Sequence, residues 1–303
     1  MDRQTCFCGE DGIVFLHYAS KHLCEKHFIR MFDKRFRKTV GVHKMLRKND
    51  RVVVGLSGGK DSTVLLHSLA QLKKDLPFEL IALTIDEGIK GYRARTLAIA
   101  KKECETLGIE QVILGFKKET GKSLDEAMAE EPSEKLPCTH CGVLRRYLLN
   151  KGARELKATK LALGHNLDDI AQTVFMNIMR NEPSRLARMN DPILKSARFV
   201  PRIRPLMLTP EKENAIYAML KGIEIEHVEC PYARFAFRSH VRKMLNESEE
   251  RYPGTKFKVV NAFLEIEGAL RKKYSKGAKM IFCSSCGEPS SQKICMYCKR
   301  VYS

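Results

Sequence analysis

An alternation of strand and helix patterns through the middle of the chain constrains the fold more than any other feature. Residues 51–56 and 79–86 are short, continuously apolar runs, and each is followed by a longer helical pattern. Parallel strands need crossover helices of this kind, and the helices then cover both faces of the sheet. We therefore expect an α/β fold on a doubly wound, Rossmann-like parallel sheet, with ligands at the carboxyl ends of the strands.

The same patterns predict the remaining elements. Between residues 181 and 209 the chain is rich in Arg and Pro without clear periodicity, so we expect a loop there, suited to substrate contact. Cys104 lies in a helical pattern and is expected to be a core residue. The expected strands are residues 51–56, 79–86, 111–116 and 159–165, and the expected helices are 61–74, 93–108, 141–157, 168–180, 210–220, 235–252 and 258–274.

Cysteine and histidine residues gather at the two ends of the chain and divide it into three modules. With 303 residues, 44% of them hydrophobic, the chain can form one sizeable core and small appended modules. We expect a zinc-binding module over residues 1–34, a catalytic domain over 35–275 and a second zinc module over 276–303.

The charge balance favours a polyanionic partner. The 54 Lys and Arg residues exceed the 36 Asp and Glu residues by 18 positive charges, enough to hold nucleic acid by counterion release. Some of the basic clusters are expected to be ordinary solvated helix faces. The clusters cover residues 30–38, 180–188, 195–204, 234–243 and 271–279.

The chain has the features of a cytoplasmic protein. No apolar run reaches the roughly 18 to 20 residues that cross a bilayer, and the first residues lack the order of a secretory signal, so we expect no membrane partner. Eleven cysteines in a chain without an export signal are better explained by metal binding than by disulfides.

The most specific motif is SGGKDS, placed directly between an expected strand and an expected helix. Adjacent glycines let the backbone approach a phosphate, and the helix N-terminus offers unpaired N–H groups with a favourable dipole. The spacing differs from that of the Walker A loop. We therefore predict a phosphate-binding loop of another type, formed by Ser57, Gly58, Gly59, Lys60, Asp61 and Ser62.

The tail and the head each carry four metal-ligand residues. The tail has two CxxC pairs, a spacing that suits tetrahedral zinc. In the head, the pair Cys6 and Cys8 is closer than the usual CxxC, so His17 or His22 is a substitute ligand. The expected zinc ligands are Cys6, Cys8, Cys24 and His27 in the head, and Cys283, Cys286, Cys295 and Cys298 in the tail.

A third cysteine set combines Cys138 and Cys141 with the distant Cys230. Three thiolates can hold a [4Fe-4S] cluster and leave one iron without a protein ligand. The same set can also form a zinc site completed by His140, or a redox pair with a third catalytic thiol. We favour the cluster and keep the other two as alternatives.

The motif SGGKDS resembles the PP-loop of the N-type ATP pyrophosphatases, which cleave ATP between the α and β phosphates. The later segment GHNLDD at residues 164–169 is similar to the same superfamily, although Asp168 and Asp169 alone also suit helix capping. The resemblance implies that backbone at Gly55 with Leu56, and at Ile85 with Asp86, holds the adenine. It further implies Mg²⁺ on Asp61 and Asp169.

The CxxC pair followed by Arg145 and Arg146 resembles the TtcA/TtuA family of tRNA thiolation proteins, and the two flanking zinc modules are similar to its TtuA branch. This implies a cluster on Cys138, Cys141 and Cys230 beside the ATP site, with Arg145 near ATP. It also implies a tRNA substrate, a homodimer, and sulfide or a ubiquitin-like carrier as sulfur donor. The implied ATP-binding residues are Gly55, Leu56, Ser57, Gly58, Gly59, Lys60, Asp61, Ser62, Ile85, Arg145, Gly164 and Asp169.

The resemblance implies tRNA 2-thiouridine synthesis in two steps. ATP adenylates O2 of a uridine, and sulfur then displaces AMP at C2, with Lys60, Asp61 and the three central cysteines as catalytic residues. His165 is a candidate for contact with phosphate or substrate. Two alternatives remain: the same thiolation by a cysteine persulfide without a cluster, and a zinc-dependent RNA-binding protein whose PP-loop only senses nucleotide.

Overall fold

The computed structural model describes residues 4–130, 137–190, 196–226, 230–232, 237–276 and 280–302. Parts of three basic clusters, at residues 195, 234–236 and 277–279, lie outside the described residues. None of the described helices is both long enough and apolar enough to cross a bilayer.

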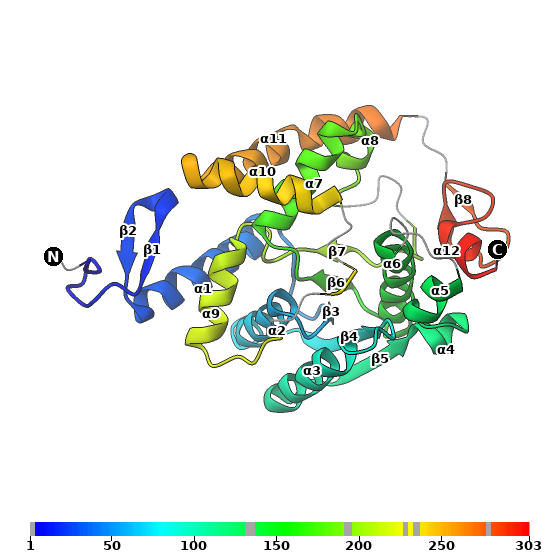
Figure 1. The fold of residues 1–303 in the computed structure, drawn as a ribbon, viewed down its shortest axis with the longest axis horizontal. Coiled ribbons are helices and arrows are strands. Elements are labelled where there is room, and N and C mark those ends of the chain that lie inside the picture. Colours follow the sequence, from blue (N-terminus) through cyan, green and yellow to red (C-terminus); the bar gives the residue numbers. More distant parts are fainter. Residues whose placement is uncertain are drawn as a thin grey trace.

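Five parallel strands form the central sheet, as expected. They are β3 (Arg51–Gly55), β4 (Glu79–Asp86), β5 (Gln111–Gly115), β6 (Lys160–Leu163) and β7 (Arg202–Ile203), in the order β5-β4-β3-β6-β7 (Figure 1). The chain moves outward from β3 through β4 and β5 and then starts again on the other side at β6. The order therefore reverses between β3 and β6, and ligands of such sheets bind at that reversal.

The strand register brings the ends of β3 and β6 to one level, while β4 continues beyond them to Asp86. Gly55 at the end of β3 pairs with Leu83 on one side and with Leu163 on the other. The segments that follow β3 and β6 therefore leave the sheet side by side. This register is what places the SGGKDS loop next to Gly164.

The two faces of the sheet have separate cores. Along β3, Val52 and Val54 belong to one core and Val53 belongs to the other, as the two-residue period of a strand requires. The first core includes buried residues of α1 (Glu25–Val42), α2 (Lys60–Leu72), α3 (Arg93–Leu107), α7 (Leu167–Met179) and α9 (Glu211–Leu220). The second includes residues of α4 (Phe116–Thr120), α5 (Leu124–Glu130), α6 (Pro137–Glu155) and α12 (Met296–Val301).

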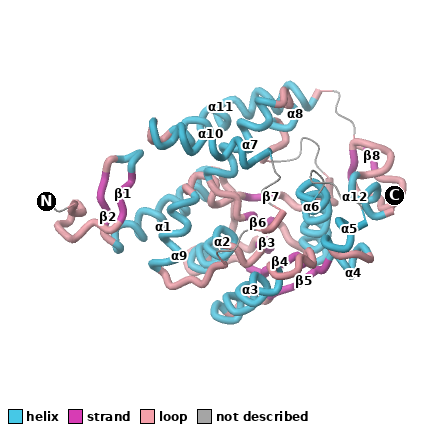
Figure 2. The backbone as a smooth tube through the Cα atoms, in the orientation of Figure 1, coloured by secondary structure: helices cyan, strands magenta, loops and turns pink. Residues whose placement is uncertain are grey.

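A further helical layer lies beyond the carboxyl end of β6. The helices α10 (Phe237–Arg251) and α11 (Thr255–Ser275) pack on α7, and α11 also contacts α8 (Pro183–Leu186) (Figure 2). The basic residues of α10 are thereby placed above the site at the strand ends.

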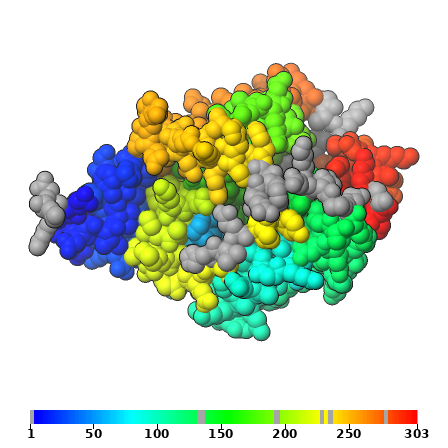
Figure 3. Space-filling model, in the orientation of Figure 1, coloured from blue at the N-terminus to red at the C-terminus, as the bar shows by residue number. Residues whose placement is uncertain are grey.

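The two cysteine-rich modules lie at opposite ends of the molecule (Figure 3). The head contains the hairpin of β1 (Val14–Leu16) and β2 (Lys21–Leu23), joined by the 3-10 helix His17–Ala19. Helix α1 follows and continues through residues 34 and 35, between which the boundary of the head module was expected. The tail contains β8 (Ile281–Phe282), β9 (Pro289–Ser290) and α12, and it docks on α6, where Tyr147 stacks on Tyr297 with ring centroids 3.5 Å apart.

Several local expectations were wrong. The expected loop over residues 181–209 contains α8 and the edge strand β7, whose two residues are too few to show a strand period. The strand expected over 111–116 ends at Gly115, because Phe116 begins α4. The helix expected from residue 141 already begins at Pro137, since proline tolerates the first helical position well.

Candidate nucleotide and metal sites

The loop between β3 and α2 is curled around one hydroxyl group. The side chain of Ser62 accepts a hydrogen bond from the backbone N–H of Ser57 at 3.1 Å and donates one to the carbonyl of Gly59 at 2.9 Å. Gly58 has a φ of +79°, and a Cβ at this position would lie 1.9 Å from the carbonyl oxygen of Thr96, so only glycine fits. Because α2 begins directly after the loop, the unpaired N–H groups of its first turn are available to an anion.

A pocket of about 470 Å³ opens where β3 and β6 end. All the residues expected to bind ATP line this pocket except Gly58 and Asp169. Gly58 instead supports the curl of the loop. Gly164 lets the two loops approach closely, because a Cβ there would lie 3.0 Å from the backbone nitrogen of Ser62.

The pocket carries a large excess of positive charge. In the part of the chain that the structure describes, its carboxylates are those of Asp61 and Glu87. Burial lowers the pKa of both Arg146 and Arg202, and neighbouring arginines lower them further. Such a concentration of guanidinium groups suits a polyphosphate. The cationic lining residues are Lys60, Arg93, Arg145, Arg146, Arg202, Arg204 and Arg238.

Arg93 joins the ends of β3 and β4 and was not anticipated from the sequence. Its guanidinium, 3% exposed as a residue, donates to the carbonyl of Ser57 at 2.7 Å and also to the carbonyl of Ile85. Glu87 holds it from the other side, with 2.9 Å between Nε and Oε2. Asp86, expected beside the adenine, turns its carboxylate to the backbone N–H of Gly88 at 2.9 Å.

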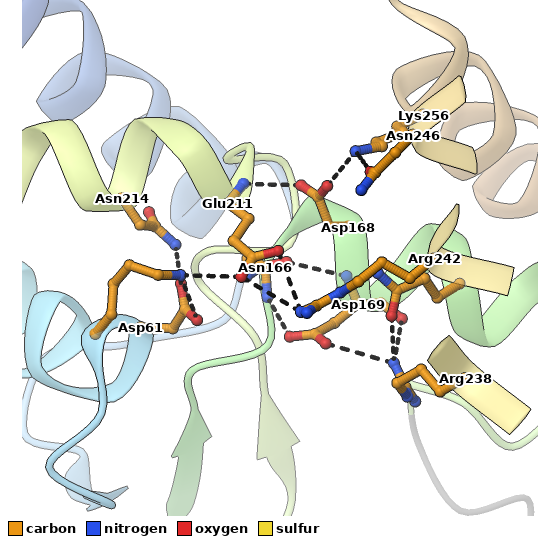
Figure 4. A network of polar contacts seen from close by, with 12 residues as sticks. Asp61, Asn166, Asp168, Asp169, Glu211, Asn214, Arg238, Arg242, Asn246 and Lys256 are labelled. Carbon is orange, nitrogen blue, oxygen red and sulfur yellow. Dashed lines mark hydrogen bonds and ion pairs between the residues drawn. The ribbon is translucent and has the colours of Figure 1, made fainter. Parts of the chain in front are cut away.

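Carboxylates and cations alternate at the start of α2, α7 and α9 (Figure 4). Asp61 accepts from Lys60 at 3.0 Å, and Lys60 also reaches Glu211 at 3.3 Å. Asp169 lies 3.4 Å from Arg238. Burial raises the pKa of Asp169 to about 6, and the nearby Asp61 and Glu211 contribute to the increase although Arg238 opposes it. Lys60 therefore contacts two of these carboxylates, and Asp169 is affected by their negative charge.

Helix capping explains part of the segment GHNLDD. Asn166 caps α7 in a capping box with Asp169, whose backbone N–H it accepts at 2.9 Å. Asp168 is buried outside the pocket, where it contacts Lys256 and accepts from the backbone N–H of Glu211 at 2.8 Å. Asp168 therefore ties three helices together, whereas Asp169 both caps a helix and faces the charged network.

His165 lines the pocket beside the strand end, as the sequence suggested. Burial lowers its pKa to about 3, and Arg204 and Arg238 add to the effect. The imidazole is therefore neutral at physiological pH and offers a hydrogen bond rather than a positive charge.

The central cysteines lie close together at the N-terminus of α6. The thiol of Cys138 donates to the carbonyl of Tyr232 at 3.4 Å, which brings the Cys230 segment against the first turn of the helix. Burial raises the pKa of Cys141 to about 12, and the thiols of Cys230 and Cys138 add to the rise while Arg145 opposes it. The three sulfur atoms therefore share one environment.

Among the described residues, the three central cysteines and His140 do not form one of the compact groups whose ligand atoms all lie within 4.8 Å of one another. Four ligands of a single zinc ion must be that close, whereas thiolates that bind three different irons of a cubane stand farther apart. The three central cysteines and His140 therefore lack the compact arrangement that the head and tail ligands show.

The head ligands form such a compact group. The ligand atoms of Cys6, Cys8, Cys24 and His27 all lie within 4.8 Å of one another. His27 points its Nδ1 atom toward the cysteines, 3.2 Å from the sulfur of Cys24 and 3.4 Å from the sulfur of Cys6. The substitutes His17 and His22 instead pack on the Phe15 ring, with centroids 4.8 and 4.4 Å away.

The tail ligands form the second compact group. Cys283, Cys286, Cys295 and Cys298 also lie within 4.8 Å of one another by their sulfur atoms. Backbone N–H groups of Cys295 and Cys298 donate to the sulfurs of Cys283 and Cys295 at 3.2 and 3.4 Å. Hydrogen bonds of this kind stabilise thiolates, and backbone N–H groups lower the pKa of Cys283 to about 6.

Comparison with known proteins matches residues 24–249 to the ATP_bind_3 family, described as a PP-loop domain. The tRNA-5-methyluridine(54) 2-sulfurtransferase of Pyrococcus horikoshii is 35% identical, over 97% of this chain and 92% of the relative. Cytoplasmic tRNA 2-thiolation protein 1 of Anopheles gambiae is 35% identical, over 96% and 85%.

A solved structure is similar over almost the whole chain. It is that of the U34-tRNA thiolase NcsA from Methanococcus maripaludis with its [4Fe-4S] cluster. The two share 35% sequence identity and a TM-score of 0.84, covering 99% of this chain and 96% of the other. The similarity therefore includes both terminal modules as well as the sheet.

Proposed function

The chain belongs to the family of PP-loop tRNA 2-thiolation proteins, and from this premise we propose that it uses ATP to replace O2 of a tRNA uridine with sulfur. The position of α6 carries the proposal. Its first turns bear Cys138 and Cys141, and Arg145, one turn further on, lines the nucleotide pocket. One rigid helix thus connects a sulfur site to an ATP site. The reaction needs this proximity, because the same uridine must react first with ATP and then with sulfur.

The nucleotide pocket would perform the activation step. A carbonyl oxygen is a poor leaving group, so O2 of the uridine attacks the α-phosphorus of ATP and pyrophosphate leaves with the electrons of the broken bond. The N–H groups at the start of α2 would hold the phosphates, and Lys60, Arg145 and Arg238 would neutralise the charge that develops on them. Hydrosulfide then bonds to C2, and AMP leaves with O2.

Asp61 and Asp169 would hold Mg²⁺ on the departing pyrophosphate. The ion usually combines one or two carboxylates with phosphate oxygens and water, so a complete protein cage is unnecessary. The raised pKa of Asp169 reflects burial and repulsion from nearby carboxylates, which a divalent cation would relieve. These residues therefore fit a site that forms when ATP is present.

Cys138, Cys141 and Cys230 would hold the [4Fe-4S] cluster. The donor set fits, because Cys138 and Cys141 lie in the first turns of α6 and the Cys230 segment contacts that end of the helix. Burial raises the pKa of the Cys141 thiol, and the helix N-terminus and Arg145 favour its thiolate form against that effect. A cluster held in this way supplies an iron without a protein ligand, which is available to external sulfur. The chain's part is to keep that position close to the nucleotide pocket through α6.

We assign zinc to the two compact ligand groups at the ends, because three cysteines with one histidine, and four cysteines, are typical tetrahedral sets. We also propose the division into modules at residues 1–34, 35–275 and 276–303. Since α1 crosses the first boundary, the head would be rigidly attached to the catalytic domain.

The remaining partners follow from the family. We propose sulfide or a ubiquitin-like carrier as sulfur donor, a homodimer as the assembly, and the cytoplasm as the location, in line with the name of the Anopheles gambiae relative. The relatives act at different positions, U34 in one and uridine 54 in another. Mass spectrometry of tRNA from a deletion strain identifies the position used by this chain.

The central test combines cysteine variants with two readouts. Cys138→Ser, Cys141→Ser and Cys230→Ser should each lose iron and thiolation, because each removes one cluster ligand. All three should retain slow tRNA-dependent release of pyrophosphate, since activation needs no sulfur. The wild-type protein, reconstituted anaerobically, is the control.

The same experiment separates the alternatives. Thiolation by an iron-free preparation supplied with a persulfide donor would refute the cluster mechanism and support persulfide chemistry. Absence of tRNA-dependent pyrophosphate release from the reconstituted wild-type protein would instead support the RNA-binding protein without catalysis.

A further inference from the structure

Helix α1 presents a row of basic side chains. Arg30, Lys34 and Lys38 are exposed and lie four residues apart, so they occupy one face of the helix over about 12 Å. None of the three forms an ion pair with a carboxylate in the part of the chain that the structure describes. The acidic Asp33 points elsewhere, because it accepts hydrogen bonds from Tyr217 at 2.9 Å and from Gln71 at 3.2 Å.

This row borders a hollow between α1 and the head. The hollow has a volume of about 940 Å³, and Lys21 of β2 adds a further cation opposite the helix. Among the residues that the structure describes, none of the side chains that line it is acidic. Phe7 lies between the expected metal ligands Cys6 and Cys8 and lines this hollow, and it is 76% exposed. Exposed aromatic rings of this kind stack on unpaired bases.

The basic surface continues from the head toward the nucleotide pocket. A second hollow shares Arg35 and Lys38 with the first and includes His43. A third hollow also includes His43, and Arg202 and Arg204 line both this hollow and the nucleotide pocket. Figure 1 shows α1 running from the head hairpin toward the sheet in the same direction.

Among the described residues that line this path, cations outnumber carboxylates, and Arg35 is paired with a buried carboxylate, that of Glu213, at 2.6 Å. The third hollow adds Lys44, Lys160 and Arg271, and its one carboxylate within the described part of the chain is that of Glu267. Glu267 is engaged by the amide of Asn190 at 2.8 Å. Adjoining hollows with shared cationic walls match an extended polyanion rather than a small anion.

We propose that the phosphate backbone of the substrate tRNA binds along this path, from Arg30, Lys34 and Lys38 of α1 to the nucleotide pocket. This proposal rests on the proposed function, and it identifies the surface that binds the RNA backbone. Phosphate contacts position a nucleic acid, and a reacting base must leave its stack to enter a pocket. The three basic residues of α1 would therefore bind phosphates of nucleotides that are distant from the modified base.

The expected size of the effect follows from counterion release. Each phosphate contact contributes about 0.7 to 0.9 to the slope of log affinity against log salt, which corresponds to about fivefold in affinity at 0.15 M salt. Removing three contacts should therefore lower the slope by about 2 to 3 and weaken tRNA binding by about 100-fold.

The test compares Arg30→Ala/Lys34→Ala/Lys38→Ala with the control Lys101→Ala/Lys102→Ala/Lys118→Ala, whose three cations are exposed on α3 and α4. Both variants remove three positive charges. We expect the α1 variant to lose about 100-fold in tRNA affinity, with the reduced salt slope, and to raise KM for tRNA while pyrophosphate release at saturating tRNA stays unchanged. Zinc content and the urea midpoint report folding, and Lys34→Glu tests the row with a single change.

Three outcomes would overturn the proposal. The first is tRNA affinity of the α1 variant within twofold of the control. The second is weaker binding with an unchanged salt slope. The third is unchanged tRNA affinity with lost sulfur transfer from a ubiquitin-like carrier, which would make α1 a protein-docking surface. Failure of the proposed function is distinguishable, because wild type would then release no pyrophosphate while tRNA binding could still be compared.

Discussion

Replacing Gly58 by alanine should disable the phosphate-binding loop by displacing it. The added Cβ would stand 1.9 Å from the carbonyl oxygen of Thr96, and real Cβ contacts below 3.0 Å essentially do not occur, so the loop and α3 must separate by about 1 Å. The left-handed backbone adds about 1 to 2 kcal/mol and the overlap about 1 to 3 kcal/mol. We therefore expect a loss of about 2 to 5 kcal/mol in the free energy of unfolding.

The catalytic effect should be larger than the stability effect suggests, because a displacement of about 1 Å in a positioning group costs about 100-fold in rate. The assay is tRNA-dependent pyrophosphate release at a temperature where the variant is folded by urea denaturation. Gly108→Ala is the matched control, since Gly108 ends α3 with a φ of +62° and a Cβ there meets nothing within 4 Å. It should lose about 1 kcal/mol of stability and no activity. Equal stability and equal turnover of the two variants would refute the reasoning.

Three further predictions test separate parts of the molecule. Lys60→Ala should lower pyrophosphate release by at least about 100-fold and leave tRNA affinity in filter binding nearly intact; an equal collapse of tRNA binding would contradict the assignment. Cys286→Ser should release one zinc per chain by elemental analysis without loss of iron, because the tail ligands form a local set. Arg35→Ala should cost about 3 to 5 kcal/mol in urea unfolding, since it leaves Glu213, now 2.6 Å from Arg35, charged and buried; pairing Arg35→Met with Glu213→Gln should recover much of that loss.

Local patterns predicted the parts of the fold that are long and regular. Buried strands such as β3 and β4 read as continuous apolar runs, and the helices between them show clear periods, so the parallel sheet could be predicted from the sequence. The two-residue β7 could not, because its pairing with β6 depends on a neighbour about forty residues away. The same limit applies to α4, which begins at the last residue of an apparent strand.

The sequence by itself determined the features whose partners are close along the chain. The SGGKDS loop lies between one strand and one helix, and the tail ligands span residues 283–298, so the members of each motif are brought together by a short stretch of backbone. Spacing also picked out the central CxxC pair. Each of these motifs combines residue types that have few other uses at that spacing.

Only the tertiary structure decided which charged residues serve the site. Arg202 and Arg238 come from an edge strand and α10 and belong to two of the expected basic clusters, whereas Arg93 of α3 lies outside them. Asp168, adjacent to Asp169, is withdrawn into a buried contact with Lys256. Charge acts through space and burial, and both depend on how distant elements pack, so no local pattern could separate these arginines from those on the surface.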